Sequence, residues 1–259
     1  MPLVRIHIHE QVGSIILNRP EKRNALSRAL LADLQQALAD LHREKRVRAV
    51  VLTGSGSAFC AGMDLAEMRN TAAQDDAQVQ WQEDAETYRD LVEQMLLFPK
   101  PIIAAVNGPA LAGGAGLVLA SDLVIAAPEA TFGLPEPKRG LVAGIVAPLL
   151  YFRLGGAKSA WLLLTAEVAT AAEAERLGLF QELIPGDKLW ARATQLGGQC
   201  AACAPEALLM TKRMLNETIG ENLTTLLNAG AALSATARTT ETAAEGLAAF
   251  LEKREPKWP

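Results

Sequence analysis

Pro101–Glu136 reads PIIAAVNGPALAGGAGLVLASDLVIAAPEATFGLPE, and the rest of the chain is organised around it. The apolar run Ile102–Val106 predicts a strand, which a glycine-rich turn follows. We expect a helix to open at Gly113–Gly114 and a second strand to cover Asp122–Ala127. The first N–H groups of a helix have no intrahelical acceptor, so this junction directs free backbone donors at whatever lies in front of it.

Glu136 ends this stretch and stands between Pro135 and Pro137. The two prolines restrict the backbone and help to fix where the carboxylate points. Backbone N–H donors together with one positioned carboxylate suit proton transfer beside a thioester or ketone carbonyl. The stretch also fits a parallel-sheet crossover whose glycines only permit tight packing. Its glycine spacing does not match the G-x-G-x-x-G fingerprint of dinucleotide-binding proteins.

The composition excludes several classes of protein. With 259 residues and 50% hydrophobic content, the chain is long enough to bury a large core. A net charge of −4 and the lack of a long basic run give little support to nucleic-acid binding. No apolar run approaches the length of a membrane span, and the N-terminus has no signal-peptide pattern, so we expect a cytoplasmic protein. Three histidines and three cysteines without ligand spacing predict no metal site.

Upstream of the central stretch, the pattern predicts alternating strands and helices. Residues 3–9 and 12–18 alternate as a β-hairpin does, and Ser27 is expected to cap a helix that ends near Glu44. Val47–Leu52 predicts a buried strand, and a second glycine-centred turn, Phe59–Leu65, follows that strand. Residues 66–98 read as helical, with these side chains facing inwards: Val79, Tyr88, Leu91, Val92, Met95 and Leu96.

Downstream, Phe180–Ile184 predicts one more short strand, and the remaining pattern is helical. We therefore expect an α/β core over residues 1–185 and a helical region over residues 186–259. The helical region would pack on the core or on a neighbouring subunit.

The motifs together resemble those of the crotonase superfamily, the enoyl-CoA hydratase/isomerase family. The resemblance covers nearly the whole chain in order. Its matching pieces are Asn18-Arg19-Pro20, Asn24-Ala25-Leu26, Phe59–Leu65, Val106-Asn107-Gly108, Gly113-Gly114, Ser121-Asp122, Phe132–Glu136, Glu245-Gly246 and Phe250–Arg254.

The resemblance implies a crotonase-like spiral of ββα units with a C-terminal helical trimerisation region. It implies a homotrimer, or a dimer of such trimers, and an acyl-CoA thioester as substrate. CoA would be part of that substrate, so no separate cofactor is expected. The thioester oxygen would lie between the N–H groups of Met63 and Gly113, with Glu136 as the group that moves the proton. Further substrate contacts would come from Arg23, Ala25, Leu26, Ala61, Gly62, Asp64, Leu65, Gly114, Gly116 and Lys253.

One position departs from the family pattern. Members that hydrate double bonds usually carry two glutamates, and Gly116 occupies the position of the first. A single carboxylate suffices to shift a double bond, so hydration and isomerisation both stay open. Thioester hydrolysis, decarboxylation, hydratase-lyase chemistry and non-catalytic acyl-CoA binding are also compatible with the sequence.

Four other residues have structural interpretations that compete with functional ones. Cys60 lies beside the expected oxyanion hole but has no histidine nearby, so we interpret it as a small buried residue. We expect Asp122 to anchor its strand. Trp81 and Met68 either line the acyl pocket or pack in the core.

Overall fold

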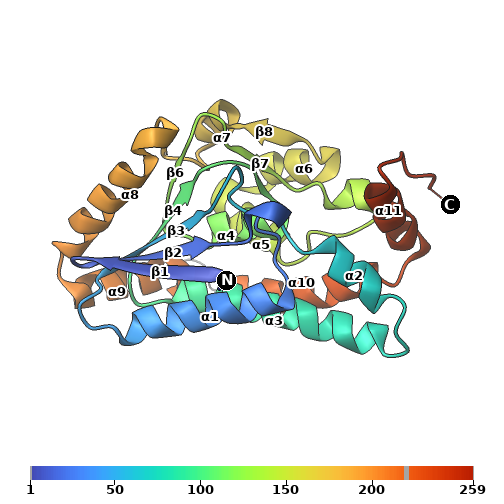
Figure 1. The fold of residues 1–259 in the computed structure, drawn as a ribbon, viewed down its shortest axis with the longest axis horizontal. Helices are drawn as coiled ribbons and strands as arrows, with labels where there is room; N and C mark the ends of the chain where they lie inside the picture. Colours follow the sequence, from blue (N-terminus) through green and yellow to red (C-terminus); the bar gives the residue numbers. More distant parts are fainter. Residues whose placement is uncertain (1, 219–221, 259) are drawn as a thin grey trace.

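The computed structural model describes residues 2–218 and 222–258, and Figure 1 shows the arrangement of its elements. Six strands form the larger sheet in the order β1-β2-β3-β4-β6-β9. β1 pairs with β2 in the antiparallel sense, and every later pair in this sheet is parallel. The strands are β1 (Val4–His9), β2 (Val12–Leu17), β3 (Ala49–Gly54), β4 (Ile102–Val106), β6 (Leu123–Ala126) and β9 (Glu182–Leu183).

A smaller sheet of three strands has the order β5-β7-β8. It consists of β5 (Ala110–Leu111), β7 (Thr131–Gly133) and β8 (Val168–Thr170). β5 follows β4 almost directly, and β7 leads within a few residues to Glu136. This sheet therefore brings the two ends of the central stretch together.

Both faces of the larger sheet are covered. On β3, Val50 and Leu52 join the main core, whereas Ala49 and Val51 join a second core that α8 (Gly186–Ala201) completes. Alternate residues of a strand point to opposite faces, so β3 is apolar throughout. Figure 1 shows α1 (Arg28–Arg43) and α3 (Ala77–Leu97) on the side of the sheet opposite α8.

The remaining helices and short helical turns complete the fold. They are the turns η1 (Pro20–Lys22) and η2 (Glu136–Arg139), the π-helical η3 (Met214–Thr218), and α2 (Leu65–Thr71), α4 (Gly113–Leu119), α5 (Val146–Leu154), α6 (Gly156–Thr165), α7 (Ala171–Leu177), α9 (Pro205–Arg213), α10 (Leu223–Ala237) and α11 (Glu241–Glu252). α10 packs against α3 and α5, and α11 packs against η2 and α2.

Most predicted elements are confirmed, with small shifts of their ends. The hairpin, the helix capped by Ser27 and the strand Ile102–Val106 form as expected. The strand predicted over Val47–Leu52 instead runs from Ala49 to Gly54. Every element after β9 is helical, as predicted, and the division of the chain at residue 185 stays a prediction.

The helix predicted over residues 66–98 is two helices, α2 and α3, separated by residues 72–76. Val79 is 61% exposed, so its predicted inward position is wrong. Val79 lies nine positions before the buried Tyr88. Nine positions at 3.6 residues per turn are two and a half turns, which places the two residues on opposite faces of α3. The other five predicted inward residues are buried.

The packing of α10 on the core generates a stability prediction. A Cβ on Gly230 would lie 2.1 Å from the Gly144 carbonyl oxygen, and a Cβ on Gly144 would lie 2.1 Å from that of Gly230. Gly230→Ala should therefore destabilise the protein by about 1–3 kcal/mol through overpacking, measured by urea unfolding. Gly198→Ala, at an exposed position of α8, is the control. A Cβ there meets nothing within 4 Å, and replacing a helical glycine by alanine should stabilise the protein by about 0.5–1 kcal/mol. Equal effects of the two substitutions would contradict this account.

Candidate active site

A cavity of about 810 Å³ opens beside the N-terminus of α4. The turn after β3, helix α3, η2 and the C-terminal helices all contribute to its wall. Most of its lining residues are apolar, and charged side chains also reach it from several elements. Such a mixture is typical of sites that bind small molecules.

Two turns meet backbone to backbone at this cavity, the first at Cys60–Met63 and the second at Leu111–Gly114. The Cys60 N–H donates to the Pro109 carbonyl at 3.1 Å, and the Leu111 N–H donates to the Cys60 carbonyl at 2.9 Å. A Cβ on Gly114 would lie 2.3 Å from the Cys60 oxygen, so only glycine permits this approach. Gly62, at φ +92°, is the matching glycine of the first turn, and a Cβ there would lie 2.7 Å from the Cβ of Ala112.

This contact leaves two backbone donors free at the cavity wall. The Leu26 N–H donates to the Gly62 carbonyl at 2.8 Å, and the Asp64 N–H donates to the Leu26 carbonyl at 3.0 Å. The N–H of Met63 between them takes no part in this pairing. Within residues 2–218 and 222–258, no acceptor is found for the N–H of Met63 or of Gly113. Gly113 is the first residue of α4, so the helix offers it none.

Ala112 holds the second donor in place through an uncommon backbone conformation. Its φ of 52° and ψ of −123° lie outside the regions that residues with side chains prefer. The Ala112 N–H donates to the Gly133 carbonyl at 2.9 Å, and its own carbonyl accepts from Gly116 at 3.1 Å. Strained backbone of this kind is concentrated at functional sites, where the surroundings fix it.

Glu136 supplies the carboxylate at the same cavity. It is 9% exposed, and its Oε2 atom is buried without a hydrogen-bond partner in the described part of the chain. Burial raises the pKa of Glu136 from 4.5 to about 7, against smaller opposing effects of a backbone hydrogen bond and the Arg139 charge. A carboxylate with this pKa is half ionised near neutral pH and is suited to accept and return a proton.

Tyr88 occupies the space in front of Gly116. A Cβ on Gly116 would lie 2.0 Å from the Tyr88 hydroxyl oxygen, and that hydroxyl donates to the Gly113 carbonyl at 2.5 Å. Burial raises the pKa of Tyr88 well above its usual value, so the phenol keeps its proton. The chain thus holds a neutral hydroxyl in the space that a side chain at residue 116 would need.

Hydrogen bonds of buried and partly buried polar side chains support the turn at Cys60–Met63. The Arg19 Nη1 donates to Asp64 Oδ2 at 2.6 Å, and Asp64 Oδ1 caps α2 by accepting from the Ala66 N–H at 3.0 Å. Burial alone would raise the pKa of Asp64, but these hydrogen bonds outweigh it and hold the pKa below its usual value. The fully buried Asn24 donates from Nδ2 to the carbonyls of Ala58 and Phe59 at 2.8 and 3.2 Å.

Not all of the predicted site residues reach the cavity. Those that line it are Arg23, Ala25, Ala61, Met63, Asp64, Leu65, Gly113, Glu136 and Lys253. The other four predicted residues lie behind the residues that line the cavity. They hydrogen-bond to the lining segments or, as glycines, allow other groups to approach closely: Leu26, Gly62, Gly114 and Gly116. Lys22, Arg23 and Lys253 are exposed and contribute positive charge to the lining.

The cavity residues that were not singled out as site residues from the sequence include Tyr88, Arg139 and Arg238. Tyr88 was predicted only as an inward-facing residue of a helix. Arg139 follows Glu136 in η2, and its guanidinium lies 4.4 Å from the centre of the Phe250 ring. Arg238 caps the C-terminus of α10, which contains no charged residue, and this isolated charge is the signal that marks it in the sequence.

Two other expectations concern reactive groups. Burial raises the pKa of the Cys60 thiol to about 12, so Cys60 is not a nucleophile at neutral pH. Asp122 Oδ2 accepts from the Ile102 N–H at 2.8 Å and from Lys212 Nζ at 2.7 Å, which agrees with its expected anchoring role.

In the part of the chain that the structure describes, no group of three or more histidine, cysteine or carboxylate side chains could hold a metal ion. None of the described helices is both long and apolar enough to cross a membrane.

Comparison with known proteins identifies the family. The model of the enoyl-CoA hydratase/isomerase family matches residues 7–259. The chain belongs to the enoyl-CoA hydratase/isomerase family. A putative enoyl-CoA hydratase of Thermus thermophilus is 41% identical over 253 residues, which are 95% of this chain and 97% of the relative. The 1,2-epoxyphenylacetyl-CoA isomerase of Escherichia coli is 32% identical and covers 100% of this chain and 98% of its own.

Solved structures of the family confirm the predicted fold class. An enoyl-CoA hydratase/isomerase from Xanthobacter autotrophicus has a TM-score of 0.88 and 31% identity, covering 99% of this chain and 98% of its own. The α/β fold with a mixed sheet and C-terminal helices is therefore that of the enoyl-CoA hydratase/isomerase family. The trimerisation expected of those helices stays a prediction.

The raised pKa of Glu136 predicts how stability depends on pH in this family member. The folded protein holds the Glu136 proton up to about pH 7, whereas an unfolded glutamate loses it near 4.5. The contribution of Glu136 to the free energy of unfolding is therefore fully present below the pKa of the unfolded state, and it is lost as pH rises through the pKa of the folded state. Glu136→Gln cannot ionise, so at pH 8 it should be more stable than the native protein by about 3 kcal/mol.

Urea unfolding at pH 5 and pH 8 measures this difference. The difference in free energy of unfolding between the native protein and Glu136→Gln should be smaller at pH 5, where both folded proteins carry an uncharged side chain at this position. A difference that is the same at both pH values would show that the carboxyl is not protonated more readily in the folded state.

Proposed function

We propose that the chain is an enzyme that moves a proton on the acyl group of a CoA thioester and so shifts the double bond of an enoyl-CoA. The observation that carries this proposal is the buried Glu136 carboxyl group, whose Oε2 has no hydrogen-bond partner among the described residues, in the same cavity as the N–H groups of Met63 and Gly113, for which those residues offer no acceptor. Leaving these groups unpaired costs stability, which a bound substrate would recover.

In the proposed mechanism, the thioester oxygen accepts hydrogen bonds from the N–H groups of Met63 and Gly113. Removing a proton from C2 or C4 places negative charge on that oxygen, and the two donors stabilise it most strongly in the transition state. Glu136 takes the proton and returns it at another carbon. Cationic Lys22, Arg23 and Lys253 in the cavity lining suit the phosphates of CoA.

Tyr88 is the reason for placing a double-bond shift first. Moving a double bond needs one proton carrier, whereas hydration needs a water held between groups that each accept or give a proton. The Tyr88 hydroxyl fills the space of a side chain at residue 116 and already donates to Gly113. Hydration is the second candidate, because several relatives are named hydratases.

A panel of enoyl-CoA thioesters, analysed by mass spectrometry, tests the proposal. Isomerisation leaves the mass unchanged, and hydration adds one water. Glu136→Gln should lower turnover by about 10²- to 10⁴-fold, because the amide keeps the shape of the carboxylate without its basicity. The native kcat/KM should fall as pH drops below about 7, where Glu136 becomes protonated. Binding of CoA thioesters without turnover of any of them would instead favour a non-catalytic acyl-CoA-binding protein.

The trimer also belongs to this proposal. Large apolar residues of the C-terminal helical region are about half exposed or more, among them Met210, Met214, Leu215, Leu226 and Leu233. Exposed apolar surface of this kind is typical of an interface between subunits. Light scattering at micromolar concentration should give three or six times the chain mass of 27.6 kDa. A stable monomer would contradict the expected assembly. A cytoplasmic location completes the proposal, and cell fractionation tests it.

A further inference from the structure

Arg238 brings a buried positive charge to the cavity. It lies at the end of α10, is 7% exposed and lines the cavity together with Ser234, four residues earlier on the same helix face. The one hydrogen bond that its side chain makes to the described residues is long, 3.4 Å from Nη1 to the Trp81 carbonyl. No carboxylate of the described chain lies within ion-pair distance of it.

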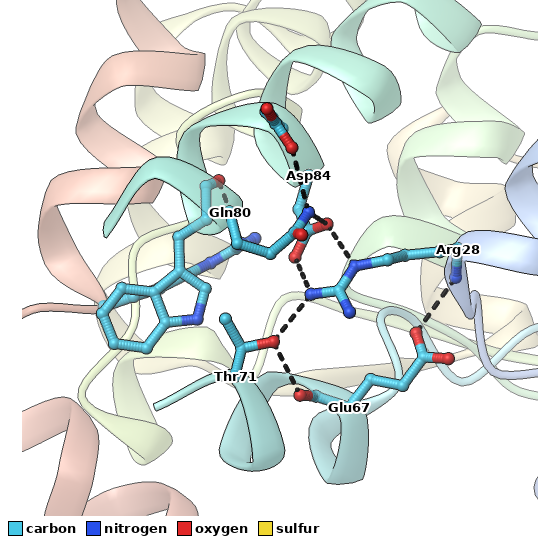
Figure 2. A network of polar contacts seen from close by, with 8 residues as sticks. Arg28, Glu67, Thr71, Gln80 and Asp84 are labelled. Atoms are coloured by element: carbon cyan, nitrogen blue, oxygen red, sulfur yellow. Dashed lines mark hydrogen bonds and ion pairs between the residues drawn. The ribbon is translucent and has the colours of Figure 1, made fainter. Parts of the chain in front are cut away.

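The nearest acid already has a partner, as Figure 2 shows. Arg28 holds both oxygens of Asp84, with Nε to Oδ1 at 2.6 Å and Nη2 to Oδ2 at 2.8 Å. Gln80 adds a third donor at 3.1 Å, and Thr71 and Glu67 complete the network around Arg28. The charge of Asp84 is therefore matched by Arg28, and Arg238 is left as the additional cation.

Burial lowers the pKa of Arg238 to about 10, with Asp84 acting against the shift and Arg28 adding to it. The guanidinium therefore stays charged at neutral pH. A charge taken out of water without a partner strongly destabilises a protein, so such a group is expected to meet an anion when the site is filled.

The place of Arg238 along the cavity suggests which part of a substrate meets it. Trp81 and Tyr88 are seven residues apart on α3, or roughly 10 Å along the helix axis. Tyr88 bonds to Gly113 at the proposed thioester position, and Arg238 bonds to Trp81. Apolar side chains also line the cavity, among them Met68, Ala85 and Val146. An acyl chain could follow this apolar wall from the thioester carbonyl to Arg238.

We infer that the acyl group of the substrate ends in a carboxylate and that Arg238, assisted by Ser234, binds it. The substrate class is then the mono-CoA thioesters of dicarboxylic acids. This inference rests on the proposed function, since it places the thioester at Met63 and Gly113. Arg238 is a binding residue here and takes no part in proton transfer.

Equilibrium binding of saturated thioesters tests the inference without depending on turnover. A series of acyl-CoAs that end in a carboxylate is compared with methyl-ended acyl-CoAs of the same length, using isothermal titration calorimetry. One carboxylate-ended length should bind about 10- to 100-fold more tightly than its methyl-ended match, as expected for a hydrogen-bonded charge pair. Equal or weaker binding of every carboxylate-ended ligand would overturn the inference. Failure of all acyl-CoAs to bind would instead overturn the proposed function.

Arg238→Met and Arg238→Lys identify the residue responsible. The Met variant should lose the preference while it still binds the methyl-ended ligand, which shows that it is folded, and the Lys variant should keep part of the preference. The control is Arg176→Met, the same substitution at an exposed arginine of α7, which should keep the full preference. A preference that survives in Arg238→Met, or an equal loss for both ligands, would overturn the assignment.

Discussion

The contact between the turn at Cys60–Met63 and the turn at Leu111–Gly114 is the constraint on which the site depends. Each turn follows a buried parallel strand, and the backbones meet because glycine stands at both close approaches, Gly62 and Gly114. Their meeting presents the N–H groups of Met63 and Gly113 to one cavity. A polar group without a partner destabilises the folded state, so such a contact is stable only where the rest of the fold enforces it. Arg19, Asn24 and Asp64 provide that reinforcement for the first turn.

The electrostatics of the cavity follow from burial. Glu136 lies where few donors reach its carboxylate, so its pKa rises to about 7. Tyr88 is buried as well, but its pKa moves further from neutrality, so it contributes a fixed hydroxyl and no charge. Of these two groups, Glu136 exchanges a proton near pH 7, whereas Tyr88 keeps its proton and positions Gly113 through a hydrogen bond to the Gly113 carbonyl. That division favours chemistry with a single proton carrier.

Local patterns in the sequence predicted the fold well. The strand Ile102–Val106, the cap at Ser27 and the opening of α4 at Gly113 depend on neighbouring residues, and they form as predicted. Predictions for α3 were weaker. The break after α2 has no strong sequence signal, and Val79 was placed inward although its spacing from Tyr88 puts it on the opposite face.

The site was predicted where its parts are local motifs, such as the glycine turns and the Pro-flanked Glu136. Long-range contacts could not be read from the sequence. Tyr88 fills the space at Gly116 although the two residues are distant in the chain, and Arg238 meets the cavity from a distant helix. Such contacts depend on how α3 and α10 pack, which no local pattern encodes.

Under the proposed function, the N–H groups of Met63 and Gly113 polarise the carbonyl of a bound thioester. Infrared difference spectroscopy of a bound thioester, labelled with carbon-13 at its carbonyl, measures this polarisation. The carbonyl band should move to lower frequency on binding, and Gly113→Pro, which lacks the N–H, should lose most of that shift. Gly113→Ala adds a Cβ but keeps the N–H, so it should retain the shift. A native complex whose carbonyl band stays at its solution frequency would contradict the account.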